Sequence, residues 1–191
     1  MKRIRKYVRN ILLEWTNSLD CIRDEYWGIG GSGVVVLCTE DDTIYMQRRS
    51  YKVSGGRGQW GFPGGGIPGV EGDEFYATPI YGEDGALDPN DPVFESNAFK
   101  ELEEEAGYNG LPRYKLLDSL VSYEDCGFIY KTFIIDIPLS EKQKWVPEPN
   151  PRHAWETIDD GWFAGVEWKD LDIYFGFSPI LIRKIDSYMR R

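Results

Sequence analysis

The sequence is poor in the residues that mark secreted proteins and membrane proteins. Its only cysteines are Cys21, Cys38 and Cys126, which are scattered and form no Cys-x-x-Cys pair. Because an odd number of isolated cysteines cannot build a disulfide framework, the pattern favours a reducing compartment. The sequence also lacks an apolar run long enough for a signal peptide or a membrane span. We therefore expect a cytoplasmic protein with no membrane contact.

Histidine is nearly absent, and positive charge is in deficit. The single histidine, His153, lies in a proline-rich stretch and is expected to be exposed, so a nucleophilic triad has little support. Acidic residues outnumber basic ones by 32 to 22, which gives a net charge of −10. Such a surface repels a phosphate backbone, which argues against extended nucleic acid as a partner. A small phosphorylated ligand remains compatible if a metal ion reverses the local charge.

The patterning that is present indicates one domain over residues 1–191. Apolar residues at three- and four-residue steps predict an N-terminal helix over residues 1–20, which either packs on its own domain or forms a homodimer contact. Residues 33–38 and 44–48 flank an acidic turn and predict a β-hairpin. Further strands are predicted near residues 115–123 and 128–137, with helices over residues 94–106 and 179–191. Interspersed strands and helices favour an α/β (α+β) fold with a mixed sheet covered by helices.

A long irregular segment separates a glycine-rich stretch from the predicted central helix. Residues 67–93 have neither helical nor strand periodicity, and we interpret them as an insertion loop. Loops of this length are uncommon in compact domains and usually functional, although a solvated insertion with no role is the alternative.

The central helix carries an unusual concentration of carboxylates. At 100° per residue, Glu101, Glu104 and Glu105 fall on one narrow arc beside the apolar face, while Glu103 points away. Like charges at this spacing destabilise a helix by roughly 0.2–0.5 kcal/mol per pair, and the helix dipole adds a further cost near the C-terminus. A hard divalent cation such as Mg²⁺ (or Mn²⁺) would remove this conflict. The alternative is a solvated acidic face.

This segment resembles the Nudix hydrolase family. Lys100-Glu-Leu-Glu-Glu-Glu-Ala-Gly-Tyr108 is similar to the second half of the Nudix box, Arg-Glu-U-x-Glu-Glu-x-Gly-U, in which U is bulky and apolar. Gly61-Phe-Pro-Gly-Gly65 is similar to the glycine turn that opens the box. The resemblance covers the chain from about residue 26 onward and implies a Nudix-type α/β/α sandwich. It also implies Mg²⁺-dependent cleavage of a diphosphate linkage in a small nucleoside diphosphate derivative, with an ADP-ribose-like or nucleotide-sugar substrate favoured.

The resemblance also implies roles for individual residues. Glu104, Glu105 and the Gly64 carbonyl would bind the metal, and Glu101 would bind a second ion or act as the base on water. Glu105 and Glu101 are thus the expected catalytic residues, with Lys100 orienting Glu101. Glu156 would supply a downstream metal-binding carboxylate, with Asp159, Asp160 and Glu124 as competitors. Independently of the resemblance, only one of two neighbouring strand residues can face the site, and we favour Arg49 over Arg48 as the substrate contact. Trp60 is a further substrate contact that would stack on a base, with Tyr51 and Tyr123 as other candidates.

Two departures from the family pattern stand out. The insertion lengthens the box, so that Pro92 occupies a position where the family has a glutamate, and Lys100 replaces an arginine and its bidentate fork. Two other functions are compatible with such a box. One is isopentenyl-diphosphate isomerisation, which needs a catalytic cysteine that has no supporting context here. The other is a non-catalytic Nudix-fold module that senses a nucleotide, although such modules typically lose box glutamates that this chain retains.

Overall fold

The computed structural model describes residues 30–53, 55–67, 88–108, 113–125, 128–174 and 178–189. The predicted N-terminal helix and most of the predicted insertion lie outside these residues. Within the described part, seven strands form one sheet. The strands are β1 (Gly30–Cys38), β2 (Thr43–Arg49), β3 (Trp60–Gly61), β4 (Gly64–Ile67), β5 (Lys115–Asp125), β6 (Phe128–Asp136) and β7 (Thr157–Ala164), and the helices are α2 (Pro92–Ala106), α3 (Leu139–Lys142), the 3₁₀ turn η1 (Glu167–Asp170) and α4 (Pro179–Tyr188).

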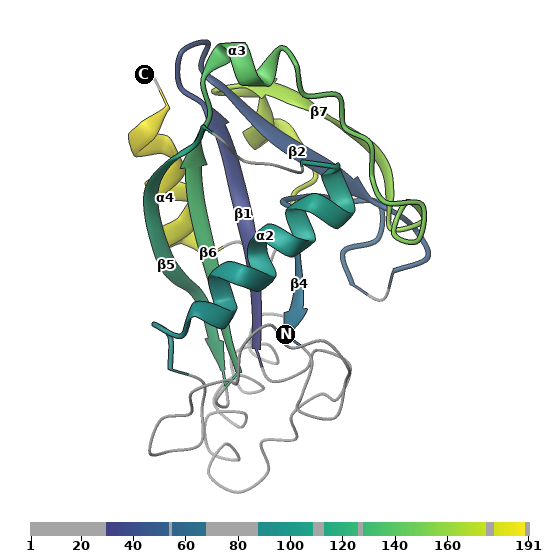
Figure 1. The fold of residues 1–191 in the computed structure, drawn as a ribbon, viewed down its shortest axis with the longest axis vertical. Helices are drawn as coiled ribbons and strands as arrows, with labels where there is room; N and C mark the ends of the chain where they lie inside the picture. The colour runs from purple at the N-terminus through teal and green to yellow at the C-terminus, as the bar shows by residue number, and fades with distance from the viewer. Residues whose placement is uncertain are drawn as a thin grey trace, which may run out of the picture.

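The sheet is mixed, as predicted. Its main path runs β3-β2-β1-β6-β5, while β4 pairs with β1 and β7 pairs with β2. The central pair, β1 and β6, is parallel, and the other strand pairs are antiparallel. Figure 1 shows β1 and β6 side by side behind α2. No helix in the described part is long and apolar enough to cross a membrane.

Strand β1 is the centre of the molecule because both of its faces are covered. All nine of its residues are buried. Val34, Val36 and Cys38 face the cluster under α2, whereas Val35 and Leu37 face the cluster under α4. A strand buried on both sides has no polar face, which explains its continuous apolar run.

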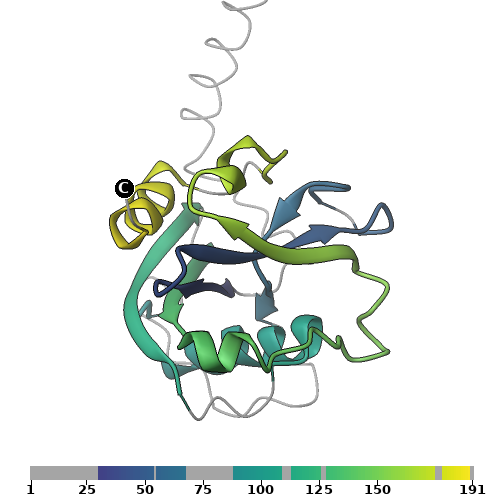
Figure 2. The ribbon, with the colours of Figure 1, turned by 90° about the horizontal axis from the view of Figure 1, so that it is seen from above.

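Helices therefore cover both faces of the sheet, and the predicted α/β/α sandwich is confirmed. The longest described helix, α2, lies across one face, and α4 lies on the other (Figure 2). Leu102 and Ala106 are fully buried on the α2 side, together with Phe94. On the α4 side, Leu181 and Ile185 pack against the other cluster.

Helix α2 starts two residues before the predicted start at residue 94 because a complete N-terminal cap precedes it. The Asp91 side chain accepts a hydrogen bond of 2.8 Å from the Val93 N–H, and Pro92 occupies the first turn. Gly107 ends the helix in the left-handed conformation, with φ of 65°, as predicted. The predicted insertion over residues 67–93 is correspondingly shorter, because Ile67 ends β4 and Pro92 begins α2.

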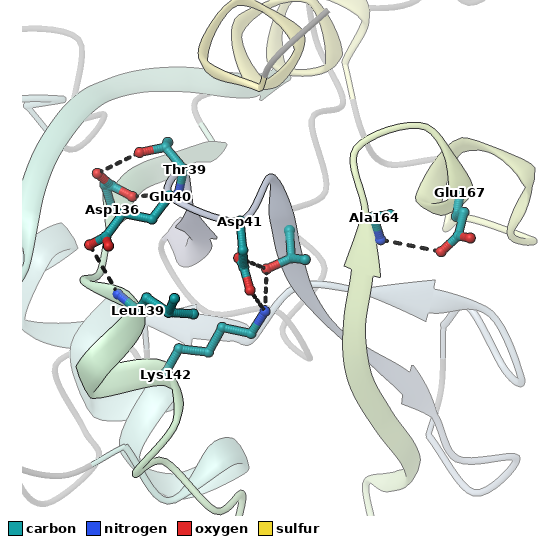
Figure 3. Close-up of polar contacts among 9 residues, drawn as sticks. Thr39, Glu40, Asp41, Asp136, Leu139, Lys142, Ala164 and Glu167 are labelled. Carbon is teal, nitrogen blue, oxygen red and sulfur yellow. Dashed lines mark hydrogen bonds and ion pairs between the residues drawn. The ribbon is translucent and has the colours of Figure 1, made fainter.

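The turn between β1 and β2 is tied to α3 at the end of β2 that lies away from Arg49. Figure 3 shows Lys142 Nζ reaching Asp41. Lys142 Nζ also donates to Thr43 Oγ1 at 2.6 Å. The Leu139 N–H also donates to Glu40 Oε1 at 3.1 Å. These contacts fix the end of the sheet that lies away from Arg49.

Candidate functional site

The predicted arc of carboxylates exists on α2. Glu105 is 6% exposed, and Glu101 and Glu104 are half-buried, whereas Glu103 points into solvent. Helix α2 packs on β1 and β4, so this face of the helix lies against the glycine turn. Three carboxylates thus converge on one protein surface, which is unfavourable unless a positive charge joins them.

Glu105 is fixed by backbone contacts. Its Oε2 accepts a hydrogen bond of 2.9 Å from the Gly64 N–H. Its own carbonyl accepts a hydrogen bond of 2.9 Å from Gln47 Nε2 on β2. The residue therefore joins α2 to both β4 and β2, and it places the predicted metal ligands Glu105 and Gly64 beside each other.

Glu101 lies against the next glycine. A Cβ built on Gly65 would lie 2.6 Å from Glu101 Oε1, a distance that real Cβ atoms do not show. Asn97 Nδ2 donates to the Gly65 carbonyl at 3.3 Å and to Ser32 Oγ at 3.1 Å, which holds the turn against the helix. Any side chain at position 65 would therefore displace the Glu101 carboxylate from the glycine turn.

Burial without a counter-ion raises the pKa of both carboxyl groups. Desolvation is the largest cause for Glu105, followed by repulsion from Glu101, and its pKa rises to about 8. Desolvation also raises the pKa of Glu101 to about 7, with repulsion from Glu104 and Glu156 adding to it and the charge of Lys100 opposing it. The pair is thus costly to ionise in the metal-free protein.

A proline-rich segment brings the downstream carboxylate to this cluster. The Asn150 N–H caps the helix by donating to the Glu104 carbonyl at 2.8 Å. The following turn returns His153 toward α2, with His153 Nδ1 3.2 Å from Glu156 Oε1 and its Nε2 3.8 Å from Glu104 Oε2. The expectation that His153 is merely exposed is therefore wrong, because the turn at Asn150 folds the imidazole between two carboxylates.

Of the four downstream candidates, the structure brings Glu156 closest to the α2 carboxylates. Its charge raises the pKa of both Glu101 and Glu105. Asp159 and Asp160 lie farther along β7, opposite Arg48 and Gln47, and Glu124 lies on the edge strand β5 with its side chain exposed.

The basic residues are divided between the site and the adjoining loop. Arg49 Nε donates to the Gly55 carbonyl at 2.9 Å, and its charge partly offsets the raised pKa of Glu105. Arg48 Nε instead donates to the Gly58 carbonyl at 2.9 Å. Lys100 Nζ lies 3.7 Å from Glu104 Oε2, so its ion pair is with Glu104 rather than with Glu101.

Trp60 is not brought to the carboxylates. Its ring packs edge-on against Phe163, with centroids 4.8 Å apart, among the residues that cover the α4 face of the sheet. The predicted stacking role of Trp60 is therefore wrong, because β3 directs the indole toward the face of the sheet that α4 covers. Tyr51 and Tyr123 are exposed, at 63% and 48%.

Tyr130 is a residue of the site that the sequence did not reveal. A Cβ on Gly33 would lie 2.7 Å from the Tyr130 hydroxyl, and one on Gly64 would collide with it. Burial raises the pKa of this phenol, and the charges of Glu105 and Glu101 raise it further. The glycines of β1 are the only sequence feature that indicates this close approach, and they do not identify the side chain that makes it.

The donor set suits a hard divalent cation. Carboxylate oxygens on one helix, a backbone turn of glycines and a fourth acid from a loop are the ligand types that Mg²⁺ prefers. The turn leaves no room for a side chain at Gly64, where a Cβ would lie 2.7 Å from the Gly33 Cα and from the Ser32 carbonyl. Among the described residues, no three acid, imidazole or thiol groups already lie close enough to share an ion. Glu105 is turned to Gly64 and Glu104 to Lys100, so the carboxylates must rotate to meet a metal.

Comparison with known families agrees with this geometry. Residues 31–176 match the model of the NUDIX domain. No curated protein matches the sequence.

One solved structure shows the same fold at low identity, and two others are similar with lower TM-scores. A Nudix hydrolase from M. smegmatis, RenU, matches with a TM-score of 0.57 and 20% identity, covering 87% of this chain and 91% of that chain. The NUDIX domain of Shewanella oneidensis NrtR, solved with ADP ribose, matches with a TM-score of 0.48 and 15% identity over 92% of this chain and 96% of that one. An ADP-ribose pyrophosphatase from Streptococcus suis matches with a TM-score of 0.46 and 16% identity over 82% and 88%.

The raised carboxyl pKa values predict that the metal-free protein loses stability as pH rises. Glutamates titrate near about 4.3 in an unfolded chain. The folded pKa values are about 7 and 8, so the folded state holds more protons than the unfolded chain from the unfolded pKa up to these values. The stability that these protons contribute is lost as the pH rises through the folded pKa values. We expect the melting temperature in EDTA to fall between about pH 5 and 8.

Glu105→Gln should flatten that decline, since it removes one of the two titrating groups. The matched control is Glu103→Gln on the exposed side of the same helix, which should follow the wild-type profile. An unchanged slope in Glu105→Gln would mean that burial of this carboxyl does not set the pH dependence.

The contacts of His153 predict a second variant effect. His153→Ala should lower kcat about tenfold, as loss of a side chain that orients a ligand often does, while KM and the melting temperature change little. His153→Gln keeps an N–H donor near Glu156 and should recover part of the loss. Equal kcat in the alanine variant and the wild type would show that the imidazole does not position Glu156.

Proposed function

The chain belongs to the Nudix family, whose hydrolases act on pyrophosphate bonds, and from that premise we propose that it uses Mg²⁺ to hydrolyse the diphosphate linkage of a nucleoside diphosphate derivative. The observation that carries the proposal is the pairing of Glu101 and Glu105 with the glycine turn. The charges of Arg49 and Lys100 offset the two carboxylates beside Gly64 and Gly65 only in part, and a divalent cation would supply the remaining positive charge.

The chain's own residues divide the work of the reaction. Glu104, Glu105, the Gly64 carbonyl and Glu156 would hold the metal, which when bound neutralises phosphate charge and activates water. Glu101 would take the proton of the attacking water, because it lies on the same helix face as the carboxylates that would hold the metal.

Two further residues act on the substrate or the ligands. Arg49 would bind a phosphate oxygen as charge develops, because its guanidinium already acts on the same carboxylate cluster. Lys100 would orient the cluster through Glu104.

For the substrate, we propose an ADP-ribose-like compound or a nucleotide sugar. Such molecules carry a base, and an exposed aromatic beside the site can stack on it. Tyr51 takes this role in place of Trp60, because it follows Ser50, whose N–H donates to the Glu156 carbonyl at 2.7 Å. The acidic chain disfavours longer anionic substrates such as RNA ends.

A nucleotide-sensing module is the second candidate function. The structure favours catalysis because Glu101, Glu104 and Glu105 all lie on the helix face that meets the glycine turn. Ligand binding with no product formation under any metal would identify the sensing module. A homodimer through residues 1–20 and a cytoplasmic location remain predictions, and light scattering with and without these residues would test the first.

Turnover provides the direct test of the proposal. Wild-type protein should release a nucleoside monophosphate from ADP-ribose or a nucleotide sugar with Mg²⁺ or Mn²⁺. Glu105→Gln should lower kcat by about two orders of magnitude or more, because it removes a charged ligand. Glu103→Gln should leave kcat unchanged. Near wild-type turnover of Glu105→Gln in saturating Mg²⁺ would overturn the assignment of Glu105.

Metal binding can be measured without any substrate. Millimolar Mg²⁺ should raise the melting temperature at pH 8, because the ion binds the folded carboxylate cluster and not the unfolded chain. The increase should shrink in a Glu104→Gln, Glu105→Gln double variant. If wild type shows no increase at saturating metal, the acidic face of α2 is simply solvated.

A further inference from the structure

The loop between β2 and β3, residues 50–59, borders the carboxylate site but has the opposite charge. Its first residue, Ser50, is bonded to the Glu156 backbone, and the strand that follows it leads directly into the glycine turn. Arg49 precedes the loop, and Lys52 and Arg57 lie within it. In a chain of net charge −10, such a cluster of cations beside the acidic helix is unexpected if it has no ligand.

These cations have no carboxylate partners among the described residues. The ion pairs within the described ranges all involve other basic residues. Arg57 Nε donates to the Val53 carbonyl at 2.7 Å, just as Arg49 Nε donates to the Gly55 carbonyl. Each guanidinium is thus anchored to the loop backbone through Nε, and that of Arg49 also lies over the Tyr174 ring, 5.7 Å from its centroid. A guanidinium has further N–H donors that can bind an anion.

The described parts of this loop, residues 50–53 and 55–59, are also held by backbone contacts. Gly56 and Gly58 have φ values of 61° and 74°, and a Cβ on Gly58 would lie 2.7 Å from the Tyr51 ring. The Gly58 N–H donates to the Arg49 carbonyl at 2.9 Å, and the Arg49 N–H donates to the Gln59 carbonyl at 2.8 Å. Cations on a preformed loop lose little conformational freedom when they bind a ligand.

We propose that Lys52 and Arg57, with Arg49, form an anion subsite for the phosphate group of the substrate that lies away from the α2 carboxylates. The metal-bound carboxylates would hold one phosphate of a diphosphate, and the loop would hold the other. The subsite deepens the proposed function and rests on it only for the identity of the ligand, because the charge and anchoring of the loop are independent of catalysis.

The test uses inorganic pyrophosphate and metal-free protein in EDTA. Without metal no ion joins the carboxylates to the anion, so binding that depends on Lys52 and Arg57 reports on the cationic loop. Calorimetric titration at low salt should show pyrophosphate binding to the wild type, weakening steeply as salt is added. The Lys52→Ala, Arg57→Ala double variant should bind at least about tenfold more weakly.

Matched controls separate local from general charge effects. Arg183→Ala with Lys144→Ala removes one arginine and one lysine from exposed positions on α4 and after α3, and it should leave the affinity unchanged. Loss of the Arg57 side chain also removes a bond to the loop backbone, so Lys52→Glu provides a second variant. The native Lys52 side chain makes no hydrogen bond or ion pair with the described residues, and only its backbone N–H is bonded, to Ser50. Lys52→Glu too should weaken binding while the melting temperature is retained.

The outcomes separate this subsite from the proposed hydrolysis. No pyrophosphate binding in EDTA, or binding equal in wild type and both loop variants, would overturn the subsite even if the enzyme hydrolyses its substrate. Loop-dependent binding in a protein that hydrolyses no diphosphate would support the subsite and overturn the hydrolase. A loss of affinity in the control variant equal to that in the loop variants would show a general charge effect and would also overturn the subsite.

Discussion

The burial of Glu101 and Glu105 against a glycine turn is the constraint on which the site depends. A carboxylate on a helix surface normally stays in water, and taking it out without a partner is costly. Here the turn approaches α2 so closely that the Glu101 carboxylate occupies the space beside Gly65, and Gly64 donates its N–H to Glu105. The fold therefore accepts unfavourable charge at one place, which is the behaviour expected of a binding site.

The surrounding structure stabilises this arrangement from several directions. The apolar side of α2 anchors the helix through Leu102 and Ala106, which are fully buried. The cap at Asp91 fixes its start, and the Asn150 N–H satisfies a carbonyl at its end. A helix fixed at both ends can present like charges on one face, because the packing energy of the other face exceeds the repulsion.

The sequence predicted features whose signal is periodic or local. The apolar run of β1 and the carboxylate arc of α2 follow from spacing alone, and the left-handed cap at Gly107 follows from residue type. It could not predict contacts between segments distant in sequence. His153 lies 49 positions after Glu104 and meets it only because the turn at Asn150 folds back, as the 3.8 Å contact shows. The same limit explains why the hydroxyl of Tyr130 went unnoticed.

Trp60 illustrates a different limit, since its distance along the chain from the glycine turn is short. An aromatic on a strand can point to either face of a sheet, and the choice depends on the register with the neighbouring strand. Trp60 pairs with Arg48, whereas Gln47 points toward α2 and bonds the Glu105 carbonyl. Alternation therefore directs the indole toward α4.

The same alternation accounts for the way positive charge is shared around the site. Arg49 is two residues after Gln47 and acts on Glu105, while Arg48 serves the loop by bonding the Gly58 carbonyl. Arg49 thus offsets part of the charge of the acidic cluster, and Arg48 holds the backbone of the loop that carries Arg57. Opposite charges lie on adjoining elements without neutralising each other, and a ligand with both a metal ion and a phosphate can satisfy both at once.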